Sequence, residues 1–78
     1  MADTADLARF RKALGMRLAA IRHRKGLTQA EVRRRIRLTI EYISQVENGH
    51  RIPTIPTLRD WALNGLGVRL EQVFRDIR

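Results

Sequence analysis

Apolar residues recur along the chain at the three- and four-residue spacing of amphipathic helices, without the alternation of a strand. This pattern predicts five helices, at about residues 6–25, 29–36, 40–48, 55–64 and 70–76. A chain of 78 residues has room for one modest core. The sequence therefore predicts a single all-α domain, residues 1–78.

The first predicted helix carries one apolar stripe, formed by Leu7, Phe10, Leu14, Leu18 and Ile21. Asp3 or Thr4 is expected to cap its start, and Gly26 is expected to end it as the residue just past the last turn.

The second and third predicted helices are short and separated by a brief turn. Thr28 and Glu31 have the spacing of a capping box, and Thr39 is a favourable N-cap for the next helix. In that helix Ile43 and Val46 are predicted to face inward, while residues 40, 41, 44, 45 and 48 form a polar face. Two short helices joined in this way form a helix-turn-helix, whose second helix can enter the major groove of DNA.

The fourth predicted helix has Pro56 in its first turn, where the missing N–H is tolerated. Asn64 and Gly65 are expected to close it, and its core-facing residues are Ile55, Leu58, Trp61 and Ala62. The apolar side of the last helix is formed by Leu70, Val73, Phe74 and Ile77.

The charge of the chain narrows the class of partner. Sixteen basic residues, fourteen of them arginine, face eight acidic residues, which gives a net charge of +8. Arginine pairs well with phosphate groups and with guanine edges. The composition therefore favours nucleic acid as the partner over a merely soluble basic protein.

Several other classes of protein are disfavoured by what the chain lacks. It has no cysteine, which excludes a disulfide framework and a thiolate zinc site and fits a reducing cytoplasm. His23 and His50 are isolated, so no metal site or cofactor is expected, and no hydroxyl has a partnered histidine and acid for catalysis. No signal peptide or membrane span is predicted.

Four stretches carry a family resemblance: "LTQAEV", "LTIEYISQVENG", "RIPTIPTL" and "LGVRLEQVF". Together, from about Leu14 to Phe74, they resemble the phage-repressor and Cro-like helix-turn-helix family, often called XRE-type. The resemblance implies a compact five-helix, lambda-repressor-like DNA-binding domain. It also implies a sequence-specific regulator of transcription that is not an enzyme.

The resemblance implies roles for the positions that match. Base-reading positions are Thr39, Ile40, Glu41, Ser44 and Gln45. Gln29 matches a phosphate-binding glutamine, and further backbone-contacting positions are Tyr42, Asn48, His50 and Arg51. Arg22 and Glu47 match a pair that joins the first helix to the third by a salt bridge, although each could also be an ordinary surface charge.

The chemistry of the predicted base-reading residues is consistent with these roles. Gln45 could make two hydrogen bonds to adenine, and Ile40 could pack on a thymine methyl group. Glu41 could accept from cytosine, or it could instead pair with a nearby arginine because an acid is repelled by phosphates. Tyr42 could contact DNA or pack against the end of the second helix.

Three features depart from the family pattern. Arg33 and Arg37 stand where alanine and glycine are usual, and Arg37 is expected to adopt the left-handed conformation that suits glycine. The stem of Arg33 can reach solvent rather than be buried. Arg34, Arg35 and Arg37 are then predicted to bind DNA phosphates. In addition, "WALNGLGV" is one residue longer than the usual junction between the last two helices.

One recognition helix reads few base pairs, so a homodimer on a palindromic operator is predicted. The expected interface comprises Leu66, Val68, Leu70, Val73, Phe74 and Ile77, although these residues could equally close the core of the monomer. The size and "EYIS" favour a restriction–modification controller or a small phage repressor. Such regulators act through their position at a promoter, where contact with RNA polymerase is one route.

Two rival functions stay open on the sequence. One is an antitoxin-type module that binds a toxin protein and its own operator. The other is a basic protein that binds nucleic acid without sequence preference, and it predicts a steep salt dependence.

Overall fold

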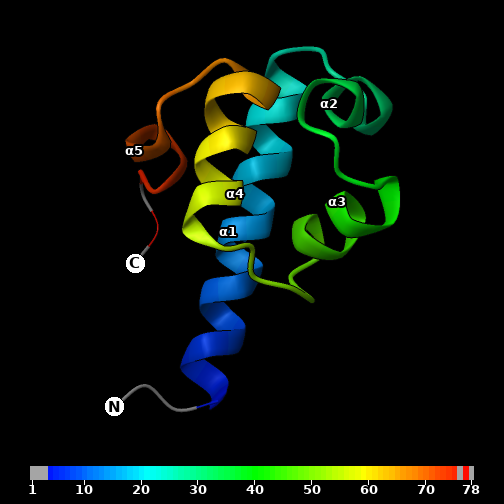
Figure 1. The fold of residues 1–78 in the computed structure, drawn as a ribbon. Coiled ribbons are helices and arrows are strands. Elements are labelled where there is room, and N and C mark those ends of the chain that lie inside the picture. Colours follow the sequence, from blue (N-terminus) through cyan, green and yellow to red (C-terminus); the bar gives the residue numbers. More distant parts are fainter. Residues whose placement is uncertain (1–3, 76, 78) are drawn as a thin grey trace.

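The computed structural model describes residues 4–75 and 77. They form the helices α1 (Thr4–Arg24), α2 (Gln29–Ile36), α3 (Ile40–Glu47), α4 (Ile55–Asp60) and α5 (Leu70–Val73), with a π-helical turn, η1 (Trp61–Leu66), directly after α4. No strand occurs among the described residues. The predicted all-α fold is therefore confirmed. α2 and α3 lie on one side of α1, and α4 and α5 lie on the other (Figure 1).

The helix α1, with 21 residues, is much longer than any other helix of the described chain. Its first turns project beyond the other helices (Figure 1), and Leu7, near the start of α1, is 45% exposed. Leu14, Leu18 and Ile21 are buried as predicted, and Phe10 is partly buried. The prediction was therefore wrong for Leu7. Thr4 lies inside the helix, and the alternative cap Asp3 lies outside the described residues.

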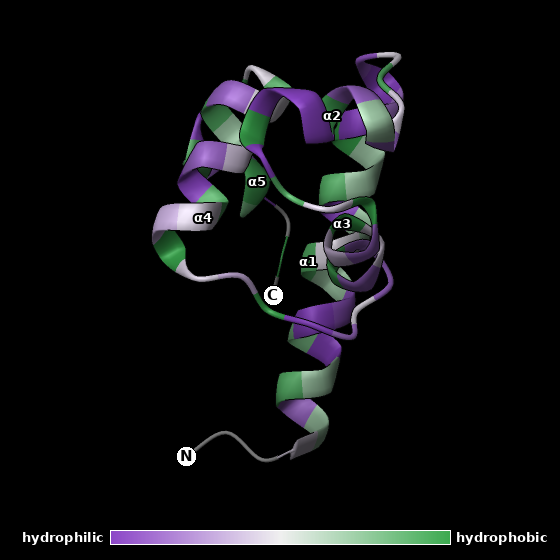
Figure 2. Cartoon of the chain, turned by 45° about the vertical axis from the view of Figure 1, so that its right-hand side comes forward, coloured by the Kyte–Doolittle hydropathy of each residue, from purple (hydrophilic) through white to green (hydrophobic). Residues whose placement is uncertain are grey.

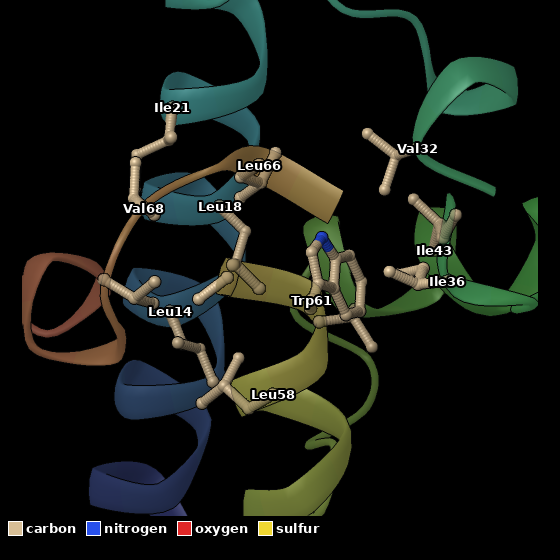
Figure 3. Packing of buried hydrophobic residues seen from close by; sticks show 13 residues of the cluster. Leu14, Leu18, Ile21, Val32, Ile36, Ile43, Leu58, Trp61, Leu66 and Val68 are labelled. Atoms are coloured by element: carbon tan, nitrogen blue, oxygen red, sulfur yellow. The ribbon is translucent and has the colours of Figure 1, made fainter. Parts of the chain in front are cut away.

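Trp61 lies at the centre of the core. Figure 3 shows its indole between the α1 leucines on one side and Ile36 and Ile43 on the other, and all of these residues are buried. Hydrophobic and hydrophilic positions alternate around the helices (Figure 2), which is the arrangement predicted for amphipathic helices packed on one core.

Threonine side chains set the starts of α2, α3 and α4. Thr28 accepts a hydrogen bond from the Glu31 N–H at 3.1 Å, and the Glu31 carboxylate accepts one from the Thr28 N–H at 3.1 Å, which completes the predicted capping box. The hydrogen bond from the Thr28 backbone lowers the pKa of Glu31, with a smaller contribution from the Thr28 hydroxyl. Thr39 caps α3, and Thr54 caps α4.

The helix that begins at Ile55 does not close at Asn64 and Gly65 as predicted. It continues as η1 to Leu66, and Gly67 ends it with φ 71°. A π-helical turn holds one more residue than an α-helical turn. The turn lies within "WALNGLGV", the stretch that was expected to be one residue longer than the usual junction. A Cβ atom on Gly65 would lie 3.3 Å from Val32 and Ile36, so this glycine serves the contact with α2.

Two other predictions concern Ile55 and the end of the last helix. Ile55 is 61% exposed rather than core-facing, because the buried face of α4 begins one turn later, at Leu58. The last helix ends at Val73, and its predicted end at Asp76 lies outside the described residues. Arg17 fixes this helix to α1 by donating two hydrogen bonds to the Gln72 carbonyl, at 2.9 and 3.2 Å.

The C-terminal end of α3 lies directly against α1. A Cβ atom on Gly15 would come within 2.2 Å of the Val46 carbonyl oxygen, and one on Gly49 within 2.9 Å of the Lys12 Cα atom. Because backbone atoms occupy these positions, no side chain can move aside. The distance between α1 and α3 therefore depends on glycine at both places.

We expect Gly15→Ala to lower the free energy of unfolding by about 3 kcal/mol, in the upper part of the usual range for overpacking. Gly26→Ala is the matched control, because it adds the same methyl group at φ 70° with no atom within 4 Å. It should cost only the backbone strain, roughly 1 kcal/mol. Urea denaturation followed by circular dichroism measures both, and an equal loss would argue against a close α1–α3 contact.

Candidate DNA interface

The face of α3 that points away from the core is polar and accessible. Ile40 and Glu41 are exposed, and Ser44 and Gln45 are partly exposed. On the opposite face Ile43, Val46 and Glu47 are buried, as predicted for the first two. The structure thus brings the predicted base-reading residues onto one surface. The hydroxyl of Thr39 is already engaged, because it accepts the Tyr42 N–H at 3.0 Å as the N-cap.

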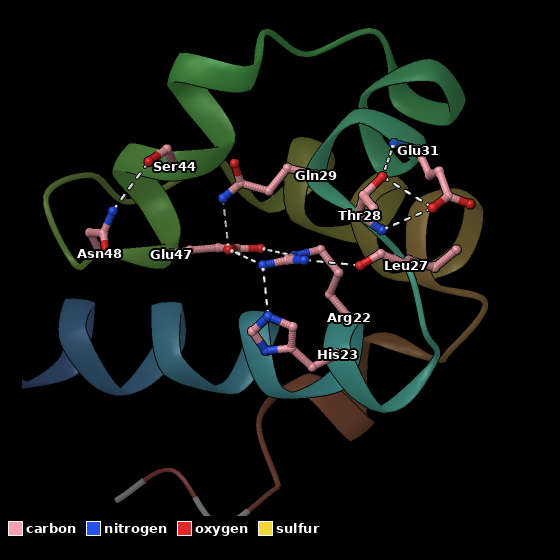
Figure 4. Close-up of polar contacts among 9 residues, drawn as sticks. All are labelled: Arg22, His23, Leu27, Thr28, Gln29, Glu31, Ser44, Glu47 and Asn48. Carbon is pink, nitrogen blue, oxygen red and sulfur yellow. Dashed lines mark hydrogen bonds and ion pairs between the residues drawn. The ribbon is translucent and has the colours of Figure 1, made fainter.

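A buried ion pair holds α3 against α1. Arg22 donates from Nε to Glu47 Oε2 at 2.7 Å and from Nη2 to Glu47 Oε1 at 2.9 Å (Figure 4). The side chains are only 10% and 6% exposed. The predicted salt bridge is therefore confirmed, and these residues are not ordinary surface charges. The hydrogen bonds to Glu47 raise the pKa of Arg22, against the opposing effect of burial.

The pair is extended by three further contacts, one of which joins Arg22 Nη2 to the neighbouring His23 Nε2 at 3.3 Å. Arg22 Nη1 donates to the Leu27 carbonyl at 2.9 Å, which fixes the turn before α2. Gln29 Nε2 donates to Glu47 Oε1 at 3.0 Å (Figure 4). A carboxamide nitrogen carries two hydrogens, so Gln29 keeps one donor for the predicted phosphate contact. This network joins α1, the start of α2 and α3.

Three further contacts fix residues at the edges of α3. Tyr42 packs against Trp61 with ring centroids 6.4 Å apart, and the Arg51 guanidinium lies 5.2 Å from the Tyr42 ring centroid. Asn48 Nδ2 donates to Ser44 Oγ at 3.2 Å. Glu41 makes no ion pair within the described part of the chain, so the predicted alternative of an arginine partner is not seen.

Among the run of arginines, Arg35 makes a contact that was not predicted. Its Nη1 atom donates to the Gly65 carbonyl at 3.1 Å, which ties α2 to η1. Arg35 is exposed and its other N–H groups make no hydrogen bond to a described residue, so its phosphate contact stays a prediction. Arg33 and Arg34 are exposed, so the stem of Arg33 reaches solvent as expected. Arg37 has φ 57° and ψ 33°, which confirms its left-handed conformation.

The predicted dimer interface divides into two groups. Leu66, Val68 and Val73 are buried in the core of the monomer, which corrects the prediction for these three residues because a side chain inside one copy cannot reach another. The remaining three pack against that core but stay partly exposed, namely Leu70, Phe74 and Ile77.

Lys12 was not foreseen as part of this surface. It is exposed on α1, and its backbone lies beside Gly49, next to Asn48 and His50 at the end of α3. Thirty-seven positions separate Lys12 from Gly49 in the sequence. Only the close packing of α1 on α3 brings this charge to the interface, and no local motif indicates it.

Among the residues that the structure describes, no group of histidine and acidic side chains could hold a metal ion. None of their helices is long and apolar enough to cross a membrane.

Comparison with known proteins places the chain in a family. A family model described as a helix-turn-helix domain matches residues 13–73. An uncharacterized HTH-type transcriptional regulator, y4dJ of Sinorhizobium fredii, is 45% identical over 59 residues, which cover 76% of this chain and 75% of the relative. The chain therefore belongs to the helix-turn-helix family.

Solved structures have the same fold. The clp gene regulator ClgR from Corynebacterium glutamicum superposes with a TM-score of 0.77 at 29% identity, covering 83% of each chain. The restriction–modification controller protein C.Esp1396I, solved as a tetramer with its natural 35 base-pair operator, gives a TM-score of 0.75 at 28% identity. That match covers 87% of this chain and 93% of the controller. The protein is thus a DNA-binding transcriptional regulator rather than an enzyme.

We expect Glu47→Ala to lower the free energy of unfolding by about 3–5 kcal/mol, because it leaves the buried Arg22 charge without a partner. Glu71→Ala is the matched control, since Glu71 pairs with Arg69 at 3.2 Å but is 70% exposed. An exposed pair of this kind contributes little. Urea denaturation of both variants measures the difference, and similar small losses would show that the buried pair does not hold the helices.

Proposed function

We propose that this protein binds a palindromic operator as a homodimer and regulates transcription in the manner of a restriction–modification controller. The observation that carries the proposal is the exposed face of α3, which the Arg22–Glu47–Gln29 network holds in one orientation. A helix fixed in this way can place its side chains against base edges reproducibly, as the second helix of a helix-turn-helix does in the major groove.

Base reading is assigned to four residues of that face. Gln45 presents a carboxamide that can form two hydrogen bonds with adenine, and Ile40 presents an apolar side chain for a thymine methyl group. Glu41 is exposed without an ion-pair partner within the described residues, which leaves its carboxylate available to the cytosine amino group. Ser44 completes the set, and Thr39 stays a predicted base-reading residue because its hydroxyl accepts the Tyr42 N–H but keeps its own O–H as a donor.

Phosphate contacts are assigned to groups on both flanks of α3. Gln29, Arg34 and Arg37 lie toward α2 and the turn, and the other flank is formed by Lys12, Tyr42, Asn48, His50 and Arg51. Such contacts set the register of a protein on the duplex without selecting its sequence. Contact with RNA polymerase stays a prediction, since no observed feature bears on it.

The controller comparison is supported by similarity along nearly the whole of both chains. The homodimer is supported by the limited reach of α3, which spans only eight residues. In a two-fold dimer the α3 helices would contact half-sites about one helical turn, roughly 34–36 Å, apart. Leu70, Phe74 and Ile77 are the partly exposed apolar residues from which we build the interface.

Binding selection from random duplex DNA at moderate salt tests the operator. We expect a palindrome to be enriched, and Gln45→Ala to lose roughly 1–3 kcal/mol of discrimination at one base pair of each half-site. Lys12→Gln is the control, because loss of a phosphate contact weakens binding equally for all sequences. Selection of no preferred sequence would support non-specific binding instead, and an enriched but asymmetric site would contradict the dimer.

Sedimentation at several protein concentrations tests the dimer. Leu70→Lys places a charge in the proposed interface and should weaken self-association at least about tenfold, or about 1.4 kcal/mol. Ile55→Lys is the control, because Ile55 is more exposed but lies on α4. Circular dichroism confirms that both variants fold. Equal effects of the two substitutions, or a monomer even with operator DNA, would refute this interface.

A further inference from the structure

A hollow lies at the turn between α2 and α3, where Arg37 has already been assigned a phosphate contact. Its volume is about 370 Å³, and it is lined by Arg33, Arg37, Leu38 and Thr39. This volume lies near the lower end of the range of small-ligand sites, roughly 300–1,000 Å³. The hollow is therefore large enough for a phosphate group with part of its sugar.

The two arginines that line the hollow have no anionic partner. Several others in the described chain are engaged, for example Arg17, Arg22 and Arg35. Arg33 and Arg37 are exposed, and neither side chain forms an ion pair or hydrogen bond with another described residue. Their backbones are joined, since the Arg37 N–H donates to the Arg33 carbonyl at 3.0 Å. Both side chains line the same hollow, and two positive charges that face one space favour an anion there.

The backbone at Arg37 supports the same conclusion. Arg37 is the only residue other than glycine with a positive φ in the described chain. That conformation is unfavourable for a residue with a Cβ atom, and an outlier of this kind points to a function of the side chain. The residue with this conformation is one of those that line the hollow.

We propose that Arg33 and Arg37 together bind one phosphate of the DNA backbone in this hollow, with Leu38 against the adjoining sugar. Thr39 directly precedes Ile40, so the hollow adjoins the proposed base-reading face. The Thr39 hydroxyl accepts the Tyr42 N–H in the cap, and the guanidinium groups supply the charged donors. The proposal rests on the proposed binding of DNA and adds a sequence-independent contact to it.

The test measures binding of the full chain to the selected operator and to a scrambled duplex, by fluorescence anisotropy over a range of salt concentrations. The variants are Arg33→Gln, Arg37→Gln and the double variant, which keep the non-glycine residue at the turn. Arg59→Gln is the matched control: it removes the same charge on α4, where the side chain is exposed and forms no hydrogen bond or ion pair with another described residue. Circular dichroism confirms folding.

If the two arginines share one phosphate, the double variant lowers the slope of log K against log salt by about 0.9 on both duplexes. Each single variant then lowers it by less, because the other arginine still holds the phosphate. A decrease of about 0.9 for each single variant would mean two separate phosphates and overturn the shared site. If the double variant and Arg59→Gln give the same slope, Arg33 and Arg37 do not contact a phosphate.

A second measurement locates the phosphate. The operators each carry one uncharged methylphosphonate linkage in place of a phosphate. At one position per half-site, this replacement should weaken binding of the wild-type protein but leave binding of the double variant unchanged. If every position affects both proteins equally, the site does not exist. Failure of the proposed function is seen separately, because a protein without sequence preference binds the scrambled duplex as tightly as the operator.

Discussion

The buried ion pair between Arg22 and Glu47 is the interaction on which the arrangement of the helix-turn-helix depends. Apolar contacts such as those of Ile43 and Val46 stabilise the packing of α3 but are not directional. The two hydrogen bonds of the pair fix its rotation, and Gln29 brings the start of α2 to the same carboxylate. A charge pair this deeply buried is costly to break, so its geometry is kept whether or not DNA is present.

This pair works only because α3 lies close to α1. Gly15 and Gly49 allow the end of α3 to approach the α1 backbone, at distances that a Cβ atom would not permit. The same approach brings Lys12 to the end of the polar face. Packing and electrostatics are thus linked: the glycines that admit the helix also determine which basic side chains flank it, and a basic flank gives affinity for the DNA backbone.

The arginine run between α2 and α3 serves several purposes in one short segment. Arg35 is part of the fold, because it contacts the carbonyl of Gly65 in η1. Arg33 and Arg37 remain outside and line a hollow, although Arg37 adopts a conformation that favours glycine. The strain at Arg37 costs roughly 1 kcal/mol. A small domain has little stability to spare, so this cost is a measure of what the positive charge at the turn contributes.

The sequence by itself determined most of the helices, the caps Thr28 and Thr39, and the inward positions Leu14, Ile43 and Trp61, because hydrophobic spacing and capping chemistry are local. Together with the family resemblance it also gave the Arg22–Glu47 pair. It did not reveal that α1 projects past the bundle, that Leu7 is exposed, that Leu66, Val68 and Val73 close the monomer core, or that Arg35 turns to η1. These features depend on which surfaces meet across long stretches of chain. Only tertiary packing decides that, since the same apolar or basic residue can serve a core, an interface or solvent.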